Sequence, residues 1–102
     1  MPTVDFDNFL NQHLSNRENA ADLLNACLTD EPAVFLKTVR DVIRANGGMT
    51  RIAAETGLAR EALYRSFSED GNPSYATITA VLAALGLRIA VEPRQDDKVI
   101  AA

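Results

Sequence analysis

The sequence predicts an all-α domain of about five short helices that is followed by one short β-strand. Apolar residues recur at helical spacing in five successive segments, and a glycine follows three of them at a place where a helix can stop. Between Leu87 and Val91, apolar residues instead alternate with other residues, which is typical of a strand. A chain of 102 residues can bury one modest core, so we expect a single small domain.

The first two helices are expected from Ser15 to Leu28 and from Asp30 to the pair Asn46-Gly47. Ser15 and Glu18 have the spacing of a capping box, and Asp30 is the expected N-cap of the second helix. Each helix has one apolar stripe, formed by Ala20, Leu23, Leu24, Cys27 and Leu28 in the first and by Phe35, Leu36, Val39, Val42 and Ile43 in the second.

The stretch from Thr50 to Phe67 predicts two short helices that meet at a sharp corner. Gly57 can adopt the positive φ that such a corner needs, and its missing side chain would let the two helices approach closely. In the second of these helices, Leu63 and Phe67 are spaced to point inward. This arrangement is that of a helix-turn-helix.

A fifth helix is expected between Ser74, as its N-cap, and Gly86, as its stop, and it leads into the strand. A single strand needs a partner, which could be residues 3–6 or a second copy of the chain. The strand therefore indicates a homodimer. We divide the chain into an acidic N-terminal segment (1–28), the helix-turn-helix domain with its strand (29–92) and a flexible tail (93–102).

Charge is segregated along the chain. The formal net charge of −4 argues against a nucleic-acid partner, because neutralising phosphates requires Lys and Arg. Between Arg44 and Phe67, however, four arginines stand against two glutamates, so this part is net positive. No apolar run is long enough to cross a bilayer, and a lone cysteine cannot form an intramolecular disulfide, so we expect a cytoplasmic protein.

Three segments carry a family resemblance: "TGLAREALYR", "GNPSYATI" and "LAALGLRI", in that order. With them, the run from Gly47 to Pro93 resembles the probable addiction-module antidote proteins, which are helix-turn-helix antitoxins with a λ-repressor-like DNA-binding domain. The preceding "AADLLNACLTDEPAVFLKTVRDVIRANGG" is similar to the N-terminal half of the same family. The resemblance implies a prokaryotic antitoxin of a type II toxin–antitoxin module that binds a RelE-like ribonuclease toxin and represses its own operon.

The second helix of a helix-turn-helix lies in the major groove, so its outward side chains are the candidate DNA-binding residues. They are Arg60, Glu61, Tyr64, Arg65 and Ser68, together with Arg51 on the first helix. An arginine could bond guanine O6 and N7, Glu61 could accept from cytosine N4, and Tyr64 could reach a phosphate or a thymine methyl. Arg51 is better placed to bind a phosphate of double-stranded operator DNA.

Each of these residues also has an ordinary interpretation. An outward face of this kind is often a solvated helix surface, and Glu61 with Arg65 could be a simple i,i+4 ion pair. One alternative function is therefore a protein-binding module, in which the acidic N-terminal half binds a basic partner and the helix-turn-helix is only a scaffold. A plain transcriptional regulator without a toxin partner is another.

An enzymatic function is the weakest interpretation. The single histidine, His13, and the single cysteine, Cys27, are far apart and give no metal-binding set. Ser66 has no neighbouring base, and "NGGMT" lacks the strand and lysine of a phosphate-binding loop. We expect no enzymatic activity, no metal and no cofactor.

Overall fold

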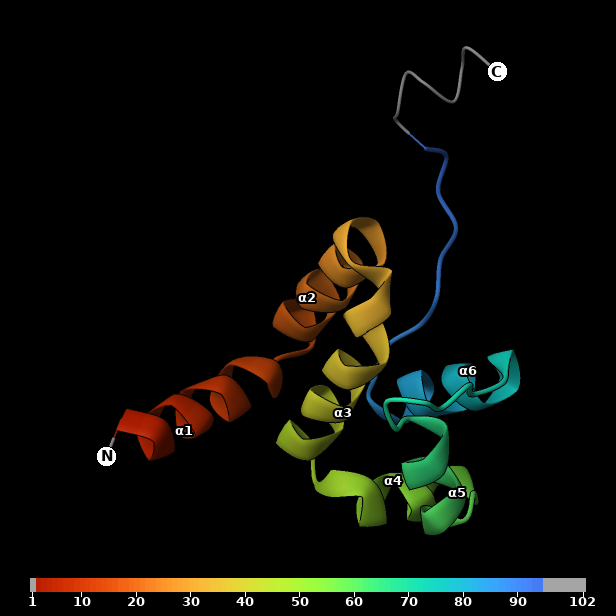
Figure 1. Cartoon of the computed structure of the whole chain (residues 1–102), viewed down its shortest axis with the longest axis horizontal. Helices are drawn as coiled ribbons and strands as arrows, with labels where there is room; N and C mark the ends of the chain where they lie inside the picture. Colours follow the sequence, from red (N-terminus) through yellow and green to blue (C-terminus); the bar gives the residue numbers. More distant parts are fainter. Residues whose placement is uncertain (1, 95–102) are drawn as a thin grey trace.

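The computed structural model describes residues 2–94 and is all-α in this range, as predicted (Figure 1). Its elements are α1 (Pro2–Leu14), α2 (Arg17–Asp30), the 3₁₀ helix η1 (Pro32–Val34), α3 (Phe35–Ala45), α4 (Gly48–Thr56), α5 (Arg60–Ser66) and α6 (Tyr75–Ala84). The described part thus has one α-helix more than the five predicted. The division of the chain at residues 28 and 92 stays a prediction.

The additional helix is α1, which projects from the rest of the molecule at its N-terminal end (Figure 1). Residues 3–6, which we considered as a partner for the C-terminal strand, lie inside it. Its C-terminal end is anchored by Leu14, which is 1% exposed, and by the half-buried Leu10. Phe6 and Phe9, by contrast, are 61% and 62% exposed.

Two predicted helix starts are wrong because neighbouring elements use the same residues. Ser15 closes α1, since its hydroxyl donates to Gln12 O at 2.8 Å, and the N-cap of α2 is Asn16, whose side chain accepts from Asn19 N–H at 3.0 Å. Asp30 does not cap the next helix but is the last residue of α2. The turn η1 then separates α2 from α3, which begins only at Phe35.

Helix α3 is the centre of the core. Its inner face consists of Val39, Val42 and Ile43, each 1% exposed, and the helix contacts α1, α2 and α4. Full burial of a side chain of this size is worth about 1.5–3 kcal/mol. The predicted apolar stripe of α3 is therefore confirmed at these three positions, and the surrounding helices are placed by packing against it.

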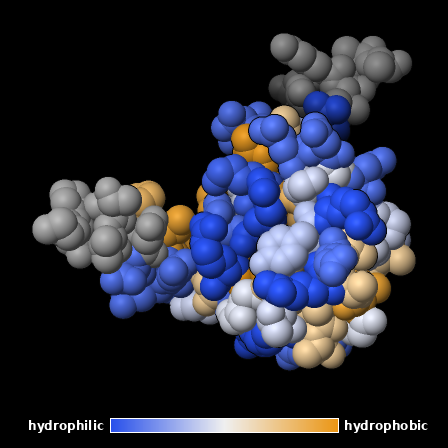
Figure 2. Space-filling model, turned by 60° about the horizontal axis from the view of Figure 1, so that its bottom comes forward, coloured by the Kyte–Doolittle hydropathy of each residue, from blue (hydrophilic) through white to orange (hydrophobic). Residues whose placement is uncertain are grey.

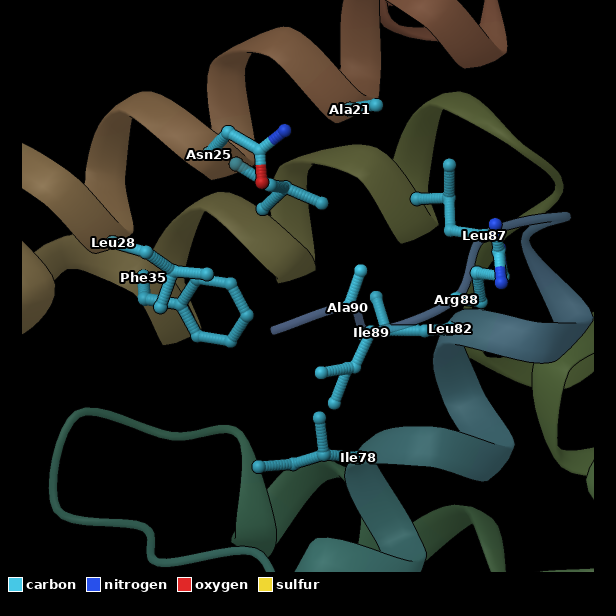
Figure 3. A pocket seen from close by; sticks show the side chains of 11 residues that line it. Ala21, Asn25, Leu28, Phe35, Ile78, Leu82, Leu87, Arg88, Ile89 and Ala90 are labelled. Carbon is cyan, nitrogen blue, oxygen red and sulfur yellow. The ribbon is translucent and has the colours of Figure 1, made fainter. Parts of the chain in front are cut away.

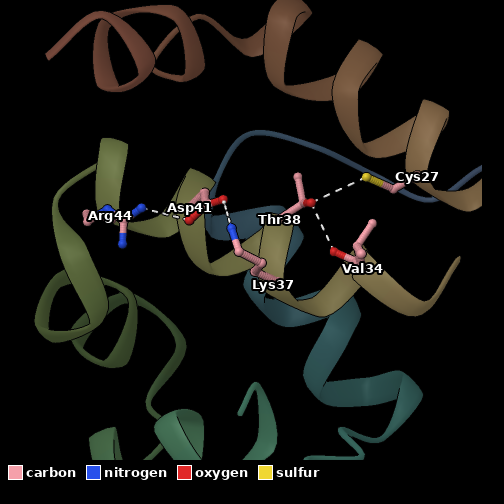
Figure 4. A network of polar contacts seen from close by, with 6 residues as sticks. All are labelled: Cys27, Val34, Lys37, Thr38, Asp41 and Arg44. Atoms are coloured by element: carbon pink, nitrogen blue, oxygen red, sulfur yellow. Dashed lines mark hydrogen bonds and ion pairs between the residues drawn. The ribbon is translucent and has the colours of Figure 1, made fainter. Parts of the chain in front are cut away.

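A buried polar contact links α2 to α3 within this core (Figure 4). The Thr38 hydroxyl donates to Val34 O at 2.9 Å, and its oxygen lies 3.3 Å from Cys27 Sγ. Because a hydroxyl has one proton, and Thr38 gives it to Val34, the Cys27 thiol is the donor of the second bond. Thr38, the buried polar residue of the described core, is thus fully satisfied.

The predicted corner between α4 and α5 is confirmed. Gly57 has φ +75°, a conformation that L side chains disfavour. A Cβ at this position would have no neighbour within 4 Å, so the expectation that the missing side chain is what lets the two helices approach is wrong, and the backbone conformation alone requires glycine. Thr56 closes the turn, because its hydroxyl donates to Ile52 O at 2.8 Å and accepts from Leu58 N–H at 3.2 Å.

The position of α5 is fixed by its inner side and at its C-terminal end. Leu63 and Phe67 are 1% and 0% exposed, as their inward spacing predicted. At the C-terminal end, the loop before α6 passes close to α5 at Gly71, where a Cβ would lie 2.0 Å from Ser66 O. Only glycine allows this approach, because the neighbour is backbone and cannot move aside.

The predicted cap and stop of α6 are confirmed, but the strand after it is wrong. Ser74 accepts from Thr77 N–H at 3.1 Å, and the helix ends before Gly86. No strand occurs within residues 2–94, and residues 88–94 follow α6 without regular secondary structure. The physical reason is the missing partner, since the candidate at residues 3–6 is helical. Most of the predicted tail, residues 95–102, lies outside the described part.

Replacing the largest core side chain tests whether the core is as closely packed as described. Phe67→Ala should lower the free energy of unfolding by about 3–5 kcal/mol, because it removes a fully buried ring and leaves a cavity. The matched control is Phe9→Ala, which changes an exposed ring and should alter stability by no more than about 0.5 kcal/mol. Urea denaturation followed by circular dichroism measures both, and equal losses would contradict the described packing.

The corner can be tested through its backbone conformation. Gly57→Ala should lower the free energy of unfolding by about 1–2 kcal/mol, because a Cβ disfavours φ +75° although there is space for it. Gly57→Asn should cost less, because asparagine tolerates the left-handed region better. Urea denaturation again gives the values, and an alanine variant as stable as the wild type would show that the corner does not need glycine.

Candidate nucleic-acid interface

The outer face of α5 carries four of the six predicted site residues. All four are exposed, whereas Leu63 on the inner side of the helix is buried: Arg60, Glu61, Tyr64 and Arg65. Figure 2 turns the end of the molecule that contains α4 and α5 toward the reader, and hydrophilic side chains cover much of that face. The spacing of α5 thus brings two arginines, a carboxylate and a phenol together on one solvent-facing surface, which we call the α5 face.

Arg60 and Tyr64 act as a pair on this face. The guanidinium carbon of Arg60 lies 5.3 Å from the centre of the Tyr64 ring, the geometry of a cation–π contact. Tyr64 is nevertheless 50% exposed, so its ring is also accessible from outside. A stacked guanidinium keeps its N–H donors at its edge, where they can still bond a phosphate or a base.

Glu61 and Arg65 do not form the simple ion pair that their spacing allows. Neither residue forms an ion pair with another side chain that the structure describes. Both side chains are exposed. The Arg65 guanidinium is therefore available to an external acceptor without first breaking an ion pair in the described part of the chain.

Ser68 is the least suited of the predicted site residues. It follows α5, is half-buried, and donates its hydroxyl proton to Arg65 O at 2.8 Å. The hydroxyl thus satisfies a carbonyl at the helix end and retains only acceptor capacity. Its contact with DNA stays a prediction.

Arg51 on α4 is exposed, but its guanidinium is already engaged. Its Nε lies 3.1 Å from Oε2 of Glu55, and Nη1 donates to the backbone carbonyl of Asn46. The side chains of Arg51 and Glu55 are 44% and 43% exposed, so the pair is accessible to water and weak. To bind a phosphate, Arg51 would exchange one of these partners for it.

Arg44 is the fourth arginine of the net-positive stretch, and it is also paired. Its Nη2 lies 2.7 Å from Oδ1 of Asp41, and the other carboxylate oxygen, Oδ2, accepts from Lys37 Nζ at 3.1 Å (Figure 4). On α4 the charge of Arg51 is matched by Glu55, whereas on α3 the single carboxylate, Asp41, is shared by two cations. Among the four arginines of the stretch, Arg60 and Arg65 on α5 are the two that form no ion pair with another described side chain.

The described residues contain neither a metal-binding cluster nor a membrane-spanning element. Among the side chains that the structure describes, no group of three His, Cys, Asp or Glu residues is placed to hold a metal ion. Over the same range, no helix is both long and apolar enough to cross a membrane.

Comparison with known proteins identifies the family. The family model described as "Probable addiction module antidote protein" matches residues 3–93. An uncharacterized protein of Haemophilus influenzae is 37% identical over 89 residues, which cover 86% of this chain and 89% of that protein. No solved structure matches the chain. The match to the family model covers nearly the whole chain, including all six described helices, and the chain belongs to the probable addiction module antidote protein family.

Proposed function

We propose that the protein is a DNA-binding antitoxin of a type II toxin–antitoxin module. It acts as a cytoplasmic homodimer, neutralises a RelE-like toxin and represses its own operon, without enzymatic activity, metal or cofactor. The family supports the antitoxin role. The observation that carries the DNA-binding role is the α5 face, on which Arg60, Tyr64 and Arg65 are exposed. The turn at Gly57 directly precedes α5.

The α5 face has the chemistry of a major-groove reader. Arg65 has no ion-pair partner in the described part of the chain and can donate two bonds to guanine O6 and N7. Arg60, oriented by its stack on Tyr64, can do the same or bond a phosphate. Glu61 can accept from cytosine N4, and Ser68 retains acceptor capacity at the end of the helix.

Arg51 contributes in a different way. The Arg51–Glu55 pair is solvent-exposed, so replacing the carboxylate by a DNA phosphate costs little. A phosphate contact adds affinity for every sequence but carries no sequence information. In the proposed complex Arg51 therefore positions the protein on the duplex, while α5 reads the bases.

The toxin-binding surface is assigned to the N-terminal half. Up to Glu31 the chain has six acidic residues and one arginine, a charge that complements a basic ribonuclease. The projecting helix α1 adds two exposed aromatic rings, Phe6 and Phe9, the second stacked on His13 with ring centres 6.0 Å apart. Exposed aromatic residues on a helix are the usual anchors when a helix binds in a groove of a partner.

A protein-binding module without DNA binding is the second candidate function. The net charge of −4 and the exposed Phe6 and Phe9 favour it, because both suit a basic protein partner better than DNA. In that case α4 and α5 would be a scaffold only. If the protein is instead a transcriptional regulator without a toxin partner, the exposed rings of Phe6 and Phe9 on α1 bind no toxin.

DNA binding is tested with the duplex immediately upstream of the gene and a scrambled duplex of the same composition, across a salt series. Arg65→Ala and Arg60→Ala should each cost about 1–3 kcal/mol on the upstream duplex and little on the scrambled one. Arg51→Ala should weaken both and reduce the salt slope by about one per subunit. The control is Lys37→Ala, an exposed cation on α3 that is paired with Asp41.

Two outcomes of that experiment would contradict the assignment. Equal, weak binding of both duplexes by the wild-type protein would favour the protein-binding module. Uniform losses from Arg51, Arg60 and Arg65 variants would show that α5 makes phosphate contacts only. Fluorescence anisotropy of labelled duplexes gives all of the required affinities.

The toxin surface is tested by titrating the small basic protein encoded beside the gene. Phe6→Ala combined with Phe9→Ala should weaken the complex by about 2 kcal/mol or more, because both rings would be buried at the interface. Tyr75→Ala is the matched control, since this ring on α6 is 72% exposed and lies outside the N-terminal half. If the control weakens the complex as much as the double variant, the toxin does not bind at α1.

A further inference from the structure

The segment that follows α6 has the sequence of a strand but no strand beside it. The backbone groups of residues 88–93 form no backbone hydrogen bond with any other described residue. Ile89 is 43% exposed and Val91 is 94% exposed, although β-branched side chains of this kind are usually buried in a sheet. An extended edge with free N–H and C=O groups is a template for pairing with another chain.

Candidates within the same chain are few. Residues 3–6 belong to α1, and every other described segment before residue 85 is helical or belongs to a short loop between helices. A second copy of the chain, in contrast, brings an identical segment with the same unpaired groups. A two-fold axis through such a segment makes one antiparallel pair and closes the assembly at two subunits.

The charges of the segment select one register for this pair. With Ala90 on the two-fold axis, Arg88 lies directly opposite Glu92 of the second copy, and this happens twice. With Val91 on the axis, Arg88 would oppose Arg94, and in a parallel pair each arginine would oppose itself. Opposite charges stabilise directly facing positions and like charges destabilise them, so the Ala90-centred antiparallel register is favoured.

In the same register, a side chain of the second copy is placed at an apolar groove. A groove of about 370 Å³ lies between α2, α6 and the segment, and its lining includes Leu28, Phe35, Ile78 and Ile89 (Figure 3). Ile89 points toward Ile78 in this view. In the Ala90-centred pair, Val91 of the second copy lies opposite Ile89 on the same face, so it is placed at this groove. Val91, which is 94% exposed in the single chain, would thereby become buried.

We propose that residues 87–92 pair antiparallel with the same segment of a second copy, with Ala90 on the two-fold axis and Val91 at the groove of the partner. This assigns an interface to the homodimer, and in that respect it rests on the proposed function. It does not depend on DNA or toxin binding. The strand predicted from the sequence is thus formed by two chains together.

A charge swap tests the register, with sedimentation equilibrium of the full chain as the measurement. Arg88→Glu should weaken the dimer about tenfold, because it places two carboxylates opposite each other at both ends of the pair. Arg88→Glu with Glu92→Arg should restore the affinity to within about twofold of the wild type, since the pairs are re-formed with exchanged positions. Val91→Asp should weaken the dimer at least as much as Arg88→Glu, and circular dichroism confirms that each variant is folded.

Disulfide formation locates the axis independently. Ala90→Cys should cross-link to its own copy under mild oxidation, because facing residues of an antiparallel pair have Cα atoms about 4.5–5.5 Å apart. Arg88→Cys and Ile89→Cys should cross-link poorly, since each faces a different residue of the partner. The wild-type chain is the control, because its one cysteine, Cys27, is buried.

Several results would overturn the proposal. A chain that is monomeric at all concentrations, or a double charge variant that stays as weak as the single one, excludes this pair. Cross-linking of Arg88→Cys as efficient as that of Ala90→Cys indicates a parallel pair, and preferential cross-linking of Ile89→Cys indicates a shifted register. An Ala90-centred dimer that binds neither upstream DNA nor toxin would instead leave this interface standing and contradict the proposed function.

Discussion

The burial of the inner face of α3 is the constraint on which the rest of the structure depends. Val39, Val42 and Ile43 can leave water only if helices cover them from several sides, and α1, α2 and α4 do so. The end of α3 is secured by one side chain, because Asn46 Nδ2 donates to Leu14 O at 3.1 Å and to Val42 O at 2.8 Å. The hydrogen bond from Asn46 to Leu14 joins the ends of α1 and α3 close to the start of α4.

The position of the α5 face follows from that junction. Helix α4 starts directly after it, buries Ile52 in the same core, and passes through the Gly57 corner into α5. Leu63 and Phe67 then attach α5 to the core, so the opposite side of a seven-residue helix needs no packing function. Arginines can occupy that side because their charges remain in water, and the backbone beneath them is fixed on rigid elements.

Much of this could be predicted from the sequence, and the failures have a common physical cause. Helical spacing located the inner faces, and Gly57 marked the corner, because both signals are local. The helix starts predicted at Ser15 and Asp30 were wrong because the polar segment between two helices can end the first or begin the second. Tertiary packing decides which helix includes it. The contact of Arg60 with Tyr64 follows their i,i+4 spacing, whereas Gly71 is required by a loop that sequence spacing cannot place.

A net charge of −4 and a DNA-reading surface are compatible because charge acts over a limited distance. At physiological salt, exposed charges separated by more than about 8 Å are largely screened, so a phosphate responds mainly to its nearest side chains. On α5 these are Arg60 and Arg65 with a single carboxylate, Glu61, while Arg51 is paired with Glu55, and Arg44 shares Asp41 with Lys37. A face with so small an excess of positive charge gives each subunit only a modest affinity for DNA. A dimer that binds the duplex through two such faces at once has a higher overall affinity.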